Sequence, residues 1–138
     1  MAKRSPAAPA PHAHPEGAAP EAPFVSSAVA RYIRISAQKT RLVADMVRDR
    51  YVGEALTILR HSEKRKASAV IEKTLRSAIA NAQNKVPSID VDALYIARIF
   101  VDQGPQLKRI RPAPMGRAFR ILKRTSHVHV YLEDRKGR

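Results

Sequence analysis

The chain has no cysteine and no tryptophan, and only 12 acidic residues accompany the 26 Lys and Arg among its 138 residues. Without cysteine it can form no disulfide bond, no cysteine-ligated zinc site and no thiol nucleophile, a composition that suits a reducing compartment. No apolar run reaches the roughly 18 residues of a membrane-spanning helix, and no predicted helix opposes a basic face to a bulky aromatic one. We therefore expect no attachment to a membrane.

Catalytic motifs are missing as well. The chain contains no glycine-rich phosphate loop, no G-x-S-x-G and no H-E-x-x-H, and its acids are scattered rather than paired. Two histidine pairs make metal binding geometrically possible: His12 with His14, and His127 with His129 on one strand face. We interpret the first pair as solvated residues of a polar tail and the second as polar or RNA-facing surface. The sequence thus predicts a protein that is not an enzyme, with no metal and no cofactor.

What the chain does have is positive charge. Its formal net charge is +14 and its sequence pI is about 10.9, above the pI of about 9 that marks nucleic-acid-binding domains. The partner is therefore expected to be a polyanion, and with no membrane signal the sequence favours a nucleic acid.

One stretch, residues 104–126, carries seven Lys or Arg and no acid. On either side, residues 91–101 and 119–132 are rich in β-branched and aromatic residues with the near-alternation of strands, so the whole region predicts one long hairpin. Pro105 cannot donate a ladder hydrogen bond and so belongs on an edge or at a bulge, next to Gly104. A ribbon of this length extends on the order of 40 Å and must project from a small sheet. The turn is marked by Pro112, Pro114 and Gly116.

The preceding residues predict a compact body. We expect a strand over residues 28–35, a helix over 37–50 after a Ser36 N-cap, a short helix over 53–61, and a long core helix over 63–84 that Pro87 ends. In the final strand Val128, Val130 and Leu132 should pack inward. Apolar spacing predicts the buried helix positions Leu42, Val43, Met46 and Val47, then Ala55, Leu56, Ile58 and Leu59, then Ala67, Val70, Ile71, Leu75, Ala78, Ile79 and Ala82.

The predicted fold class is α+β: a small three-stranded antiparallel sheet packed by about three helices, with a long projecting β-hairpin. Residues 27–132 form a single domain that includes the hairpin arm at about 101–125. Residues 1–26 are predicted to be a disordered extension, because 14 of the first 23 residues are Ala or Pro. Residues 133–138 are predicted to be a flexible basic tail.

A second basic group precedes the long helix. Arg31, Arg34, Lys39 and Arg41 lie close together in the sequence. A solvated surface and a second phosphate-contacting patch are both consistent with these residues, and their spacing does not decide between them.

The pattern resembles the bacterial-type large-subunit ribosomal protein L twenty-two family over about residues 28–132. In the arm the resemblance rests on Gly104–Pro105, Leu107–Arg109, Pro112, Gly116–Ala118, Ile121 and Lys123–His127. In the body it rests on Ala30–Tyr32, Ile35–Ser36, Lys39, Arg41–Val43, Ser77–Ala78 and Ala80–Ala82. The chain departs from the family at Ala113 and Met115, where many members are basic, and at Asp49, where Gly often closes the first helix.

The resemblance implies a cytoplasmic, non-catalytic protein of the large ribosomal subunit. It implies that the chain binds 23S ribosomal RNA, assists assembly, contacts neighbouring ribosomal proteins and does not form a homo-oligomer. The tip, Pro112 to Gly116 with Ala113, Pro114 and Met115, would line the tunnel of the nascent polypeptide. The residues expected to contact the RNA are Arg31, Arg34, Lys39, Arg41, Lys108, Arg109, Arg111, Arg117, Arg120, Lys123 and Arg124.

Two other functions fit a basic β-arm. An architectural DNA-bending protein uses paired arms with a proline near the tip to enter a minor groove, although such proteins usually act as dimers and this sequence shows no evident apolar dimer face. A free RNA chaperone is the other alternative, and it would not remain with the large subunit through a high-salt wash.

Overall fold

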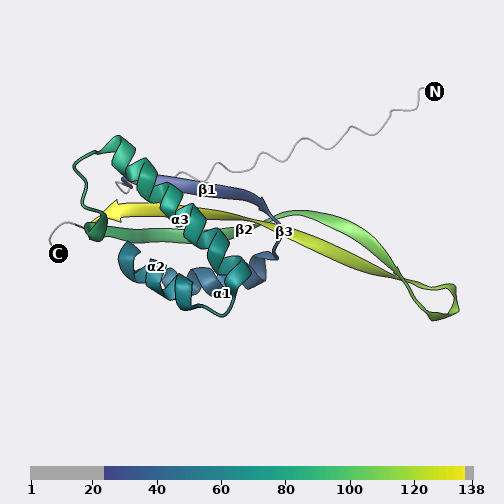
Figure 1. Ribbon diagram of the computed structural model, residues 1–138. Helices are drawn as coiled ribbons and strands as arrows, with labels where there is room; N and C mark the ends of the chain where they lie inside the picture. Colours follow the sequence, from purple (N-terminus) through teal and green to yellow (C-terminus); the bar gives the residue numbers. More distant parts are fainter. Residues whose placement is uncertain (1–23, 136–138) are drawn as a thin grey trace, which may run out of the picture.

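The computed structural model describes residues 24–135, so residues 1–23 with His12 and His14, and residues 136–138, lie outside the described part. The elements follow the order that the sequence predicted (Figure 1). They are β1 (Ser26–Ile33), α1 (Ala37–Val47), α2 (Val52–His61), α3 (Arg65–Lys85), a 3-10 turn (Val91–Ala93), β2 (Leu94–Pro112), a second 3-10 turn (Pro114–Gly116) and β3 (Ala118–Asp134).

The three strands form one antiparallel sheet in the order β1-β3-β2. The helices pack against the sheet, and the far half of the β2–β3 hairpin extends beyond them as a twisted ribbon (Figure 1). The core lies between the sheet and the helices, where Val43, Ile71 and Val128 are fully buried. The α+β class with three helices and a three-stranded sheet is therefore confirmed.

Helix α3 is the central helix of the core, as predicted. Ile71, Leu75, Ala78 and Ala82 are at most 1% exposed, and the small side chains let the helix approach the sheet closely. The helix begins at Arg65 rather than at residue 63. Ser62 does not cap it, since its Oγ accepts only a 3.4 Å bond from the Lys64 N–H.

The buried face of α1 differs from the prediction. Leu42 and Met46 are 54% and 43% exposed, whereas Thr40 and Ala44 are buried with Val43 and Val47. The spacing allowed two overlapping stripes, and close packing of α1 against the strands favoured the one with smaller side chains. The Ser36 side chain makes no cap bond, but its carbonyl accepts from the Thr40 N–H and Oγ1, both at 3.2 Å. Asp49, just past the helix, has φ +56°, the left-handed conformation that Gly often supplies.

Strand β1 alternates only over its first half. Ser26, which the sequence analysis assigned to the disordered extension, is a buried strand residue whose Oγ donates to the Ala78 carbonyl at 2.8 Å. Beyond Ala30 the register shifts, and Tyr32 adopts φ +56° with 65% exposure. Its ring lies edge-on against His127, at 4.9 Å between ring centroids. The irregularity therefore turns Tyr32 outward.

The C-terminal end is ordered further than predicted. β3 continues through Asp134, and the Arg135 N–H donates to the Ala93 carbonyl at 3.1 Å. The Arg135 guanidinium also lies 3.6 Å from the centre of the Tyr95 ring. Glu133 and Asp134, which were predicted to lie in a flexible tail, are therefore strand residues.

Candidate nucleic-acid interface

The arm, residues 104–126, is paired in a register that separates its positive charges. Directly opposite residues join a cation to an apolar side chain: Leu107 with Lys123, Lys108 with Leu122, Arg109 with Ile121, Ile110 with Arg120, and Arg111 with Phe119. Like charges directly opposite one another destabilise a ribbon, and this register has none along these five pairs. The arm can therefore carry dense positive charge without placing cations face to face.

Both faces of the arm carry the same mixture of residues. Alternate positions point to opposite faces, so Lys108 and Arg120 lie on one face while Arg109, Arg111 and Lys123 lie on the other. Ile110 and Phe119 are 77% and 63% exposed, and no arm cation makes an ion pair within residues 24–135. A ribbon that is exposed to solvent on both faces, and whose cations make no ion pair, is suited to being surrounded by a polyanion.

The tip is a tight turn without charge between Pro112 and Gly116. The Ala113 N–H donates to the Arg117 carbonyl at 2.9 Å, and Met115 and Gly116 take φ +60° and +68°. Met115 is 95% exposed. The turn predicted from Pro112, Pro114 and Gly116 is confirmed.

The base of the arm is held by close contacts. The β2–β3 register shifts between Gln103 and Gln106, as Gly104 and Pro105 predicted. The Thr125 Oγ1 donates to the Pro105 carbonyl at 2.6 Å. A Cβ added to Gly104 would lie 2.4 Å from that Oγ1, so only glycine fits there.

Arg41, which was predicted to contact RNA as part of the second basic group, has a structural role in this fold. Its Nε and Nη2 donate to the Val101 carbonyl at 3.0 and 2.8 Å, which ties α1 to β2 where the arm begins. Contact with RNA is compatible with these bonds and stays a prediction.

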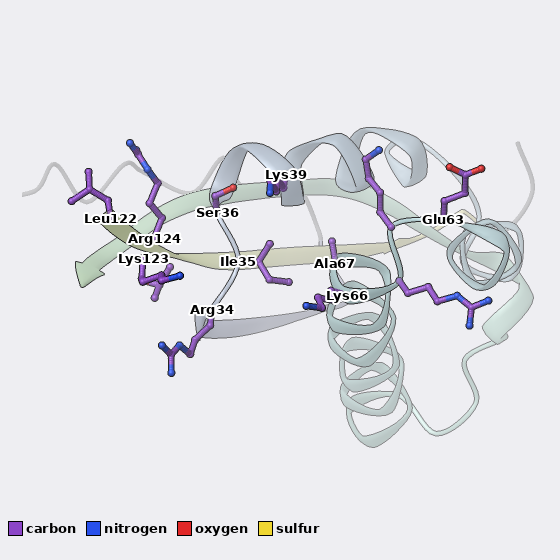
Figure 2. A pocket seen from close by; sticks show the side chains of 13 residues that line it. Arg34, Ile35, Ser36, Lys39, Glu63, Lys66, Ala67, Leu122, Lys123 and Arg124 are labelled. Carbon is purple, nitrogen blue, oxygen red and sulfur yellow. The ribbon is translucent and has the colours of Figure 1, made fainter. Parts of the chain in front are cut away.

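A cavity of about 800 Å³ lies where the arm meets the body, and we call it the basal groove. Figure 2 shows Leu122, Lys123 and Arg124 of the arm at one end, Arg34 and Ile35 near them, and Lys66 and Ala67 of α3 further along. Only one acid, Glu63, lines it. The lining cations are Arg34, Lys39, Lys64, Arg65, Lys66, Lys123 and Arg124.

The fold thus distributes the predicted RNA-contacting residues over several places. Arg34, Lys39, Lys123 and Arg124 come together in the basal groove, whereas Arg31 lies exposed on β1 and does not line it. The remaining predicted cations lie along the arm: Lys108, Arg109, Arg111, Arg117 and Arg120.

Three groove residues escaped the sequence analysis: Lys64, Arg65 and Lys66 at the start of α3. The available signal was that the first turn holds no acid, although acids are favoured there by the helix dipole.

The outer face of the sheet places His129 among aromatic rings. The His129 ring stacks on Phe100 at 4.6 Å between centroids, and its Nε2 lies 3.4 Å from the Asp102 Oδ2. Burial lowers the pKa of His129 below 6.5; the Asp102 carboxylate opposes this shift, while His127 and Arg31 add to it. The sequence analysis found no carboxylate near this histidine pair, and the fold supplies Asp102 from β2.

The neighbouring His127 has a different partner. Its Nδ1 accepts the Tyr32 N–H at 3.0 Å, so this ring nitrogen is used within the fold. No cluster of three or more metal-ligating side chains occurs within residues 24–135. Among the helices that the structure describes, none has the length and apolarity needed to cross a bilayer.

The fold and its surface define a class: small, basic α+β proteins with a projecting, cation-rich β-ribbon. The chain belongs to the family described as Ribosomal protein L22p/L17e, whose model matches residues 28–133. It is therefore a structural ribosomal protein and not an enzyme.

Two relatives show how far the similarity extends. The large ribosomal subunit protein uL22 of Solibacter usitatus is 50% identical over 110 residues, which cover 80% of this chain and 96% of the relative. The protein of the same name from Syntrophobacter fumaroxidans is 53% identical over 108 residues, which cover 78% and 96%.

Proposed function

We propose that the chain binds 23S ribosomal RNA within the large ribosomal subunit, next to other ribosomal proteins, and helps the RNA to fold during assembly. The observation that carries this proposal is the arm, with unpaired cations and exposed apolar side chains on both of its faces. Arginine forks can pair with phosphates, and the apolar side chains can pack against riboses or unstacked bases. The names of the relatives support the large subunit as the place of assembly.

The tip is proposed to line the exit tunnel of the nascent polypeptide. From Gly104 to Pro112 the arm extends about 30 Å at roughly 3.3 Å per residue, and its charge stops before the turn. Ala113, Pro114 and Met115 are uncharged, so they cannot neutralise a phosphate. An uncharged surface suits a position that faces open space. A neutral tip on a cationic shaft is the arrangement expected if RNA surrounds the shaft only.

The first experiment removes charge from the arm. Replacing Arg109, Arg111, Arg117 and Arg120 by Ala should reduce incorporation of the chain into large subunits during reconstitution, because four phosphate contacts are lost. The control replaces Arg60, Lys73, Arg76 and Arg98 of the body by Ala. Equal incorporation of both variants would refute the role of the arm.

The alanine variants of the arm and of the body also distinguish RNA binding from DNA binding. A DNA-bending protein would prefer duplex DNA to structured 23S fragments at matched salt, and its preference would depend on the arm. We expect the opposite preference in the unaltered chain. The family membership already favours the ribosomal function over the DNA-bending and free-chaperone alternatives.

The tunnel proposal has its own test. The chain has no cysteine, so Met115→Cys introduces a unique thiol at the tip. In translating ribosomes it should cross-link to the nascent chain, whereas Tyr51→Cys, an exposed position on the body, should not. Absence of a tip-specific cross-link would refute tunnel lining and leave RNA binding intact.

A further inference from the structure

We infer that the basal groove, at the junction of the arm and the body, is a second RNA-binding site, which holds a single strand of ribosomal RNA by its phosphates. This inference rests on the proposed function and adds a place and a form of RNA to it. Ion pairing distinguishes the groove cations from most arginines of the body. Within residues 24–135, the arginines that make ion pairs are Arg48, Arg50, Arg60, Arg76 and Arg135. None of them lines the groove.

The positive charges of the groove are unfavourable for the stability of the fold. Lys64, Arg65 and Lys66 begin a helix of 21 residues, where the positive end of the helix dipole repels cations. A sequence suited only to helix stability would place acids there, and the first turn has none. Four further groove cations from other elements add to the repulsion. Such a concentration of like charge fits a surface that anionic groups cover.

The volume and the lining of the groove indicate whether it would bind unpaired or duplex RNA. A volume of about 800 Å³ is far larger than one phosphate group. Ile35 and Leu122 lie among the cations (Figure 2), so the lining offers apolar contact between charged ends. A ribose or an unstacked base of a loop or bulge can use such contacts, whereas a duplex keeps its bases stacked inside. The lining therefore favours unpaired RNA.

The groove lies between the arm and the body. Lys123 and Arg124 belong to the arm, and Lys66 belongs to α3, so one strand lying in the groove contacts both parts (Figure 2). Such a strand would hold the arm in a defined direction relative to the body. The groove then orients the arm in the RNA, in addition to contributing affinity.

The test compares two full-length variants that each lose three positive charges. The groove variant carries Lys64→Gln, Arg65→Gln and Lys66→Gln, and the control carries Arg60→Gln, Lys73→Gln and Arg98→Gln, which lie outside the groove and the arm. With a 23S transcript as probe, the groove variant should reduce the slope of log affinity against log salt by about 2, since each contact contributes about 0.7. Its affinity loss between about 50 and 200 mM salt should shrink roughly fifteen- to twentyfold relative to the unaltered chain.

Backbone footprinting on the same transcript supplies the second readout. We expect the groove variant to lose protection of one stretch of unpaired nucleotides while the protections that depend on the arm persist. The charge-keeping variant Lys64→Arg, Arg65→Lys, Lys66→Arg should retain both slope and footprint. Matching circular dichroism spectra and urea midpoints of the two triple variants show that folding does not cause the difference.

Each other outcome decides a different point. If the groove variant equals the control while the alanine variant of the arm loses binding, the groove inference fails and the proposed function stands. If neither the groove nor the arm variant alters binding, the proposed function fails as well. Loss of a protected stretch that is base-paired would overturn the assignment of single-stranded RNA.

Discussion

The body and the arm share the same two strands and differ in what surrounds them. Up to Val101, alternate residues of β2 and β3 pack under the helices, and Ile99, Val101, Val128 and Val130 are at most 3% exposed. Beyond Gly104, nearly every side chain of the same two strands is exposed. Strand pairing alone is marginal in water. The body therefore contains its own packing partner, whereas the arm has none within the described residues.

The cations divide in the same way. Most arginines of the body are used within the chain, as when Arg76 pairs with Glu72 at 2.6 Å or Arg41 bonds to the Val101 carbonyl. Those of the arm and the basal groove make no ion pair within the described part of the chain. Charge that the fold does not neutralise is the charge available to a partner.

Hydrogen exchange should show the largest difference. In the free protein we expect the amides of Val128 and Val130 to exchange at least about a thousandfold more slowly than the paired amides of residues 106–124, because only the former are buried. Adding 23S RNA should slow exchange in the arm. Equal protection of both regions without RNA would show that the arm is ordered by itself.

Truncating one isoleucine in each region tests the same contrast by stability. Ile71→Ala removes a fully buried side chain and should lower the free energy of unfolding by about 3 to 4 kcal/mol. Ile110→Ala, at 77% exposure, should change it by less than about 0.5 kcal/mol. Urea denaturation measures both, and similar losses would mean that the arm packs on the body.

The junction of the two regions is sensitive to a single methyl group. Gly104→Ala should destabilise the protein by about 2 kcal/mol, because the new Cβ meets the Thr125 Oγ1. Gly53→Ala has nothing within 4 Å and should stabilise by up to about 1 kcal/mol. Adding Thr125→Ala to the Gly104 variant should cost less than the sum of the single changes in thermal unfolding. If the losses of stability in the double variant are additive, the strain of Gly104→Ala does not come from contact with Thr125.

Arg41 tests whether a predicted RNA contact is mainly structural. Arg41→Ala should lower stability by about 1 to 2 kcal/mol, since two charged donors leave the Val101 carbonyl. Arg41→Lys should lie between, because an ammonium cannot reproduce the two-donor fork. Unchanged urea midpoints together with a lower salt slope of RNA binding would instead indicate a role in RNA contact alone.

The smallest effect concerns pH. Because burial lowers the pKa of His129 in the folded state, the unfolded chain binds this proton at a higher pH than the folded chain does. The contribution of His129 to stability is therefore full above about pH 6.5 and falls as the pH drops below that value. His129→Phe should flatten the profile of unfolding free energy against pH between pH 7.5 and the folded pKa. A steeper dependence of stability on pH in the Phe variant would mean that folding raises the pKa of His129 rather than lowering it.

Local signals predicted the elements whose pattern allows only one solution. The apolar spacing of α3, the β-branched flanks of the arm and the prolines of its turn each pointed to one structure, and each is found. Helix α1 was less determined, because Leu42 and Thr40 begin two stripes with similar spacing and only the packing partner decides which is buried. The outward turn of Tyr32 depends on a register irregularity opposite β3, which no local pattern indicates.

The binding surface divides in the same way between local and distant causes. The sequence by itself determined that a dense, acid-free cationic ribbon exists and that a small core supports it, because charge and strand alternation are local properties of the chain. Only the tertiary structure, by contrast, brings Lys66 and Lys123 to the same groove, Arg41 to the Val101 carbonyl and Asp102 to His129. Those neighbours are far apart in sequence, and their proximity follows from how the helices pack on the sheet.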